Sequence, residues 1–199
     1  LADSGTGMQP CIERMFGSLQ SVVDDPSSLP ARQVLISEAN GLVDRFSSIN
    51  DRLNDQNDII NGQMEVIAGQ ISTIASSIAE LNEQIKLSFA ASNGSPPNAM
   101  LDQRDKLVGS LSELVALESV AQDGSPVNIF IGNGQALVIG NESNEIFAQS
   151  GNKDPSRAGL FFRNGDSVQE ITAQVKGGQL GGVLEFREQV LDPTINSLG

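Results

Sequence analysis

The chain has 199 residues, a formal net charge of −13 and only 12 basic residues, which are scattered singly. Nucleic acids and anionic membranes bind clustered basic side chains, so this distribution argues against both as partners. Histidine is absent and Cys11 is the single cysteine. The commonest general base, the usual zinc ligands and a disulfide framework are therefore missing. We expect no enzyme, no cofactor and no metal site.

A short helix is predicted near the start, over residues 9–23, after a flexible lead-in over residues 1–8. Its apolar face carries Ile12, Met15, Phe16, Leu19, Val22 and Val23. The run from Asp24 to Ser27 ends it. Leu1 is not an initiator methionine and no cationic apolar leader follows it, so the sequence is expected to be a piece of a longer protein. No run of about 18 apolar residues occurs, so no membrane span is expected.

One long helix, over about residues 30–90, organises the rest of the chain. Ser28 is its predicted cap and Pro30 lies in its first turn. Apolar residues then recur in alternating steps of four and three, as in the heptad seam of a coiled coil. The seam consists of Leu35, Ala39, Leu42, Phe46, Ile49, Leu53, Ile60, Met64, Ile67, Ile71, Ile74, Ile78, Leu81 and Ile85. Such a helix would be about 85 to 90 Å long, which predicts a rod.

The seam has one interruption. Gln56 takes the expected core position inside the polar run 54–58, and the steps there become four, four and three. A stutter of this kind unwinds a supercoil locally. We expect the helix to straighten or bend near Asn57.

The chain should then reverse at Ser92, Asn93, Gly94, Ser95, Pro96 and Pro97, which cannot continue a helix. A third helix over about residues 98–117 is predicted to fold back antiparallel on the C-terminal half of the long helix. Its apolar face carries Leu101, Leu107, Val108, Leu111, Leu114 and Val115.

A small antiparallel β meander is predicted between residues 119 and 175. Turn signals recur at Asp123-Gly124, Asn133-Gly134, Gly140-Asn141, Gly151-Asn152 and Asn164-Gly165. Asn-Gly between two apolar runs is typical of a hairpin, since both central residues of a type I′ turn need positive φ. The runs between the turns, residues 127–131, 136–139, 145–149, 160–163 and 168–172, are the expected strands.

A last helix is expected from residue 177, after Lys176, and should pack back against the helical rod. Asp192-Pro193 should kink or restart it, because proline lacks the N–H donor. Ile195 and Leu198 suggest that it continues past Gly199. We thus expect a mainly α fold with a small β part: a helical rod over residues 1–118, a β region over 119–176 and a returning helix over 177–199.

The shorter helices together offer roughly 50 residues against a seam of roughly 58, and a long helix is stabilised mostly by packing its apolar face. Part of the seam should therefore need helices from outside this chain, either missing terminal segments or neighbouring subunits. We predict that the packing seam and subunit contacts involve Phe46, Ile49, Leu53, Ile60, Met64, Ile67, Ile71, Ile74, Ile78, Leu81 and Ile85.

Four blocks of the sequence carry a resemblance to a known family. They are PSSLPARQVLISEANGLVDRF (residues 26–46), LNEQIKLSFAASNGSPPNAMLDQRDKLVGSLSELV (81–115), QDGSPVNIFIGNGQALVIG (122–140) and GGQLGGVLEFREQVLDPTINSLG (177–199). In order and over nearly the whole chain, they resemble the flagellar hook-associated protein 1 family, whose members join hook to filament.

The resemblance implies a bacterial axial protein that is exported unfolded by the flagellar type III apparatus and assembled outside the cell. Its implied partners are other copies of itself in a ring, the hook protein, a neighbouring hook-associated protein and an export chaperone. Family members also have amphipathic terminal helices, which this chain lacks, so we expect the chain alone to be a monomer. The sparse cysteine suits such exported proteins and makes Cys11 an oddity.

Each of these features also has an ordinary structural interpretation. The seam could belong to an ordinary intracellular coiled coil. Asp51, Asp55 and Asp58 share a helix face and could bind a cation, although a solvated face is the better interpretation. Asp102 and Asp105 mimic a catalytic carboxylate pair, but Arg104 and Lys106 offer simple ion pairs.

Cys11 has no cationic neighbour before Arg14 and is interpreted as buried or idle rather than reactive. The GNGQ run from Gly132 lacks the residues of a phosphate loop and is interpreted as turn chemistry. The rival functions are another axial subunit, flagellin or hook-associated protein 3, and a cell-wall hydrolase on an axial scaffold. The 177–199 block and the LDQRDKLV stretch argue against the other axial subunits.

Overall fold

The computed structural model describes residues 8–91, 97–121, 126–151 and 154–197. Residues 1–7 of the predicted lead-in, most of the chain reversal at 92–97, the Asp123-Gly124 turn, Asn152 and Leu198 lie outside these residues, whereas Met8 already belongs to a helix. Two compact units divide the chain, Leu1–Gln56 with Ser197–Gly199 and Asn57–Asn196. The long helix α2, Leu29–Ala91, contributes residues to both, and its predicted extent is confirmed.

The first unit is a pair of helices, α1 (Met8–Asp24) and the first part of α2. The oxygen of Ser28 accepts a hydrogen bond from the N–H of Ala31 at 3.3 Å, as expected of a helix cap. Arg14 on α1 pairs with Glu38 on α2 at 3.2 Å. Ser18 is the one buried residue among the described residues of this unit.

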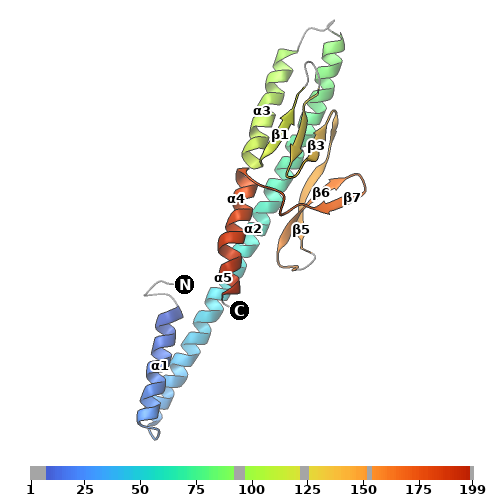
Figure 1. The fold of residues 1–199 in the computed structure, drawn as a ribbon. Coiled ribbons are helices and arrows are strands. Elements are labelled where there is room, and N and C mark those ends of the chain that lie inside the picture. The colour runs from blue at the N-terminus through green and yellow to red at the C-terminus, as the bar shows by residue number, and fades with distance from the viewer. Residues whose placement is uncertain (1–7, 92–96, 122–125, 152–153, 198–199) are drawn as a thin grey trace. The chain divides into compact units, whose positions relative to one another are not determined.

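The second unit packs around the rest of α2. Met64, Ile71 and Ile78 are completely buried there. Helix α3 (Asn98–Leu114) runs antiparallel beside the C-terminal half of α2 (Figure 1), which confirms its predicted direction. It ends earlier than the predicted residue 117, because Val115 is already extended and the following residues enter a strand.

The predicted antiparallel meander is present and is divided into two sheets. The first has the order β1-β2-β3-β4, with strands Leu117–Val120, Asn128–Ile131, Gln135–Ile139 and Glu142–Ser143. The second has the order β5-β6-β7, with strands Glu145–Ser150, Ala158–Asn164 and Ser167–Glu170. Strands β1 and β4 were not predicted. The Asn133-Gly134 hairpin turn is confirmed between β2 and β3, with φ of 95° at Gly134.

Side chains of α2 bind backbone groups of β5 and of the chain segment before β6. The hydroxyl of Ser72 donates to the carbonyl oxygen of Ile146 at 2.8 Å and accepts its N–H at 2.9 Å. Asn57 and Asn61 both donate to the carbonyl oxygen of Ser156, at 2.7 and 2.8 Å. Polar residues of the helix therefore fix the position of strands that lie far away in sequence.

The last helical segment changes its hydrogen bonding before the proline. Helix α4 (Gly178–Phe186) passes into a π-helical segment, η1 (Arg187–Leu191), and α5 (Asp192–Asn196) follows. The N–H of Asp192 donates to the carbonyl oxygen of Arg187, five residues earlier. Pro193 has no N–H to continue an α-helical ladder, and the wider turn accommodates it. The hydrogen-bonding pattern changes at the predicted Asp192-Pro193, but the backbone stays helical through it, with φ of −62° and ψ of −47° at Asp192.

Candidate functional site

The first unit carries more apolar surface than its two helices cover. Leu29, Ile36 and Val43 are 69%, 61% and 63% exposed, although they lie seven residues apart on one side of α2. The other exposed large apolar residues of the unit are Phe16, Leu19, Val23, Val34 and Phe46. Helices that are apolar on more than one side pack against more than one neighbour. This surface can therefore accept further helices.

The seam residues fall into two groups. Those buried inside the second unit are Ile60, Met64, Ile67, Ile71, Ile78, Leu81 and Ile85. Phe46 is exposed, and Ile49, Leu53 and Ile74 are half-buried. The two sheets help to cover the apolar seam in the second half of α2. The prediction that this seam would be partly uncovered took only the shorter helices into account. Only the accessible seam residues Phe46, Ile49, Leu53 and Ile74 can contact other subunits directly, and that role stays a prediction.

A groove follows α2 where α3 and α4 lie beside it. Two adjoining hollows of about 650 and 480 Å³ form it, and both are lined by Val66 and Gln70. Val66 is 61% exposed, and apart from the adjoining backbone of α2 itself no atom lies within 4 Å of the places where Cβ atoms of Gly62 and Gly69 would be. Small residues allow close backbone approach, so a helix could lie in this groove.

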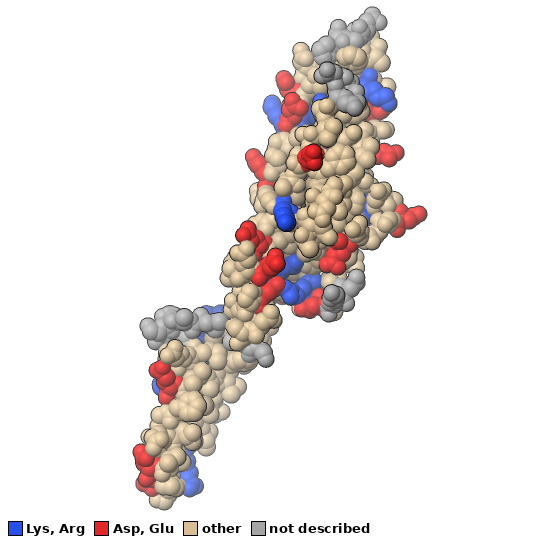
Figure 2. Space-filling model, in the orientation of Figure 1, with Lys and Arg blue, Asp and Glu red and all other residues tan. Residues whose placement is uncertain are grey.

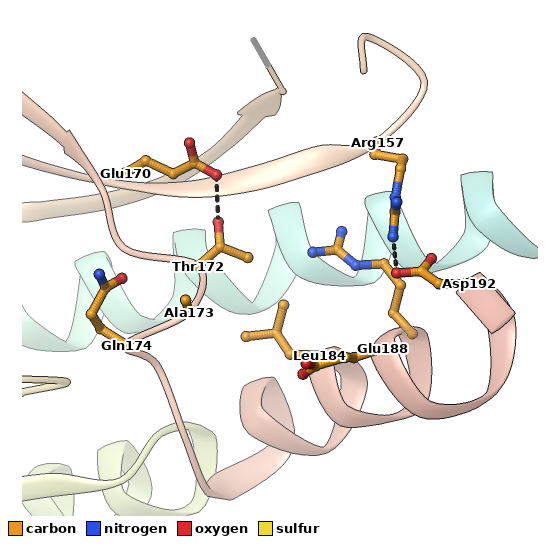
Figure 3. Close-up of a pocket in the computed structure, with 9 residues that line it drawn as sticks. Arg157, Glu170, Thr172, Ala173, Gln174, Leu184, Glu188 and Asp192 are labelled. Atoms are coloured by element: carbon orange, nitrogen blue, oxygen red, sulfur yellow. Dashed lines mark hydrogen bonds and ion pairs between the residues drawn. The ribbon is translucent and has the colours of Figure 1, made fainter. Parts of the chain in front are cut away.

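A separate pocket of about 420 Å³ lies between the β5-β6-β7 sheet and the η1 segment. Figure 3 shows Thr172 and Gln174 on the chain segment after β7, and Arg157 paired with Asp192 at the other end. The hydroxyl of Thr172 donates to Glu170 at 3.2 Å. The pocket is polar and carries charges of both signs.

The acidic groups singled out in the sequence do not assemble. Asp51, Asp55 and Asp58 are each exposed, as are Asp102 and Asp105. Over residues 8–91, 97–121, 126–151 and 154–197, no cluster of three acidic or cysteine side chains is arranged to hold a metal ion. Within the same ranges, no helix has the length and apolarity to cross a membrane.

Arg104 has a role that the sequence did not reveal. The sequence suggested a simple ion pair at Arg104, and the structure shows Arg104 as a buried residue, 7% exposed, that donates to the side-chain oxygen of Asn82 at 3.2 Å. Burial lowers its pKa, and the charge of Asp105 opposes the shift. A sequence signal exists, since Asn82 lies between Ile78 and Ile85 on the apolar side of α2, where a polar residue needs a partner.

The remaining candidates behave as turn and helix residues. Cys11 is half-buried, and Arg14 donates to its sulfur at 3.3 Å. GNGQ forms the β2–β3 turn, in which the N–H of Asn133 donates to the side-chain oxygen of Gln135 at 2.9 Å. On the face drawn in Figure 2, lysine and arginine form no continuous basic strip.

The fold and its apolar surfaces thus define a mainly helical α+β protein whose accessible packing surfaces lie along one long helix. Residues 1–199 match the family described as the flagellar hook-associated protein FlgK helical domain. The chain belongs to that family.

Relatives and a solved structure agree with this assignment. The chain is 35% identical, over its whole length, to flagellar hook-associated protein 1 of Salmonella typhimurium, and 36% identical to that of Escherichia coli K12. It covers 36% and 37% of those proteins. The flagellar hook junction protein FlgK from Burkholderia pseudomallei is similar to 96% of the chain with a TM-score of 0.87 and 32% identity, over 35% of its own length.

Proposed function

We propose that the chain is part of a non-enzymatic building block of the bacterial flagellum, which joins hook to filament by lateral packing of helices. The proposal is supported by the family match over residues 1–199 and by relatives named for the hook-associated protein. The protein would be exported and would act outside the cell, at the hook–filament junction.

The exposed apolar side of the first unit is the observation that carries this proposal. Leu29, Ile36 and Val43 remain more than half exposed on a helix pair with a single buried residue in its described part. At about 25 cal/mol per Å² of apolar surface, covering such side chains is a strong driving force for association. Neighbouring subunits or terminal helices of the same protein would supply the cover.

The groove along α2 offers a second packing surface. Val66 and the open space beside Gly62 and Gly69 would receive a helix. Its occupants would come from other copies in the ring, the hook protein, a neighbouring hook-associated protein or the protein's own terminal segments. An export chaperone would shield apolar segments before assembly.

Motility of a strain that lacks the gene tests the proposal, with full-length variants supplied in trans. Ile36→Asp and Val43→Asp should abolish swarming, because a buried charge without a partner opposes packing. Both residues are exposed, so the purified variants should keep the wild-type circular dichroism spectrum. Immunoblots should find them in the medium rather than on isolated hooks.

Ser37→Asp is the matched control, since Ser37 is an exposed polar residue of the same helix segment that lies about 100° around the helix from Ile36. This variant should swarm as the wild type does. Wild-type swarming by the Ile36→Asp and Val43→Asp strains would contradict the proposed packing surface. A hydrolytic band in a cell-wall zymogram would instead favour the enzyme alternative.

A further inference from the structure

The polar pocket beside the π-helical segment η1 contains a cation without a matching anion. Arg187 is 7% exposed, and its Nη1 donates to the carbonyl oxygen of Ala158 at 2.6 Å and to the sulfur of Met64 at 3.3 Å. Among the described residues, no carboxylate lies within ion-pair distance of it. Buried charges in proteins are normally paired, so Arg187 lacks a carboxylate at ion-pair distance, although Glu170, Glu188 and Asp192 also line the pocket.

The guanidinium has hydrogen-bonding capacity left for such a partner. Both contacts of Arg187 within the described part of the chain use Nη1, whereas a guanidinium carries five N–H donors. Nε and Nη2 are therefore available. Burial lowers the pKa of Arg187, the charge of Arg157 lowers it further, and only Glu170 opposes the shift.

Gln174 presents a second unmet requirement at the same pocket. Its side-chain oxygen is buried and has no hydrogen-bond partner within the described residues. A buried acceptor without a donor is costly. The pocket thus has places for a carboxylate at Arg187 and for an N–H donor at Gln174.

The wide turn at η1 builds this arrangement. Because Asp192 N–H bonds to the carbonyl oxygen of Arg187, these residues occupy the same side of the helix, and both line the pocket. Arg157 already neutralises Asp192, which leaves Arg187 for a ligand. Segments with π-helical bonding recur at functional sites.

The charged residues that line the pocket limit which ligands it can bind. Glu170 and Glu188 line the pocket and are exposed, so they repel a multiply charged anion such as phosphate and attract a basic group. Arg157 and Arg187 disfavour a bare cation. At about 420 Å³, the pocket is large enough for two side chains of a peptide.

We propose that this pocket binds a segment of another protein chain in which an acidic residue is followed by a basic one. The acidic side chain meets Nε and Nη2 of Arg187, a backbone N–H of the segment donates to Gln174, and the basic side chain lies beside Glu188. Assembly through the apolar surfaces does not depend on this contact.

Saturation-transfer difference NMR on the full-length protein tests this, because it detects weak ligands of large proteins. The probes are the blocked dipeptides Ac-Glu-Lys-NH₂, Ac-Gln-Lys-NH₂ and Ac-Glu-Gln-NH₂. Ac-Glu-Lys-NH₂ should bind about tenfold more tightly than Ac-Gln-Lys-NH₂, as expected for one charge-assisted hydrogen bond. Equal affinities, or no binding of any probe, would overturn the proposal.

Variants locate the binding. Arg187→Gln should remove the preference for glutamate, and a folded variant that keeps it would overturn the assignment. If Arg187→Gln does not fold, the exposed Glu188→Gln decides. It should weaken Ac-Glu-Lys-NH₂ about threefold and leave Ac-Glu-Gln-NH₂ unchanged. Glu185→Gln, an exposed position of α4 outside the pocket lining, is the matched control and should change neither.

Discussion

The side chain of Asn82 binds both backbone groups of Val127. Its Nδ2 donates to the carbonyl oxygen of Val127 at 3.0 Å, and its Oδ1 accepts the N–H of Val127 at 3.1 Å. The same amide donates to Gly140 at 2.7 Å and accepts from Arg104 at 3.2 Å. One side chain of α2 thus fixes the β1-β2-β3-β4 sheet and α3 together.

Asn82→Ala should be among the most destabilising substitutions in the second unit. It leaves the N–H and carbonyl groups of Val127 and the carbonyl group of Gly140 without this partner, and it removes one hydrogen bond of Arg104, at a site that is 1% exposed. With about 1–3 kcal/mol for each unsatisfied buried group, we expect a loss of about 3 kcal/mol or more in the free energy of unfolding. Urea denaturation followed by circular dichroism measures it.

Asn54→Ala is the matched control, because Asn54 is an exposed residue of the same helix. It should change the free energy of unfolding by less than about 0.5 kcal/mol. Equal urea midpoints for the two variants would show that the Asn82 contacts do not hold the sheet to α2.

Ser72→Ala should destabilise the β5-β6-β7 sheet locally, more than it lowers the stability of the whole chain. The variant removes both hydrogen bonds to Ile146, at a cost of about 1–2 kcal/mol. The amide of Ile146 should then exchange faster with deuterium. Ser76→Ala, at an exposed position one helical turn further on, should leave that exchange rate unchanged.

The heptad pattern predicted the long helix well, because periodicity within one helix is a local property of the sequence. It did not predict what covers the helix. Ile60 and Ile85 are buried on a stretch of α2 that also binds the sheets, and side chains such as Ser72 pair with strands far along the chain. Such contacts have no periodic signature.

The polar interruption of the seam also provides a side chain that binds another part of the chain, which the predicted stutter did not include. Asn57 is 6% exposed and binds Ser156, and Asn61 joins it on the same carbonyl oxygen. Together they attach the chain segment before β6 to α2. The sequence marked the position as unusual but gave no sign of its partner. Bending of the helix at this point stays a prediction.

Asp154 should titrate below the ordinary range of aspartate. The hydroxyl and the N–H of Ser156 both donate to its carboxylate, at 2.6 and 3.0 Å, and these bonds lower the pKa of Asp154. Because the folded pKa is the lower one, the stabilisation exists above the unfolded pKa and disappears as the pH falls through the folded value. An NMR titration of the Asp154 carboxyl carbon measures it.

Ser156→Ala provides the comparison for Asp154. It removes the hydroxyl donor, the larger cause of the shift, and keeps the N–H. The pKa of Asp154 should therefore rise toward its ordinary value without reaching it. An unchanged pKa in this variant would mean that the hydroxyl does not bind the carboxylate in solution.

Two Gly→Ala substitutions should have opposite effects on stability. Gly178 has a φ of 60°, and a Cβ there would lie 2.5 Å from the backbone of Leu114 and Val115. The left-handed conformation alone costs about 1–2 kcal/mol for alanine, and the overlap adds to it. Gly178→Ala should therefore lower the free energy of unfolding by more than about 2 kcal/mol.

Gly109 lies inside α3, and a Cβ there would meet nothing within 4 Å. Gly109→Ala should raise the free energy of unfolding by about 0.5–1 kcal/mol, because alanine loses less backbone entropy on entering a helix. Thermal denaturation of both variants beside the wild type measures the contrast. A Gly178→Ala variant as stable as Gly109→Ala would show that the tight approach of α4 to the end of α3 is absent in solution.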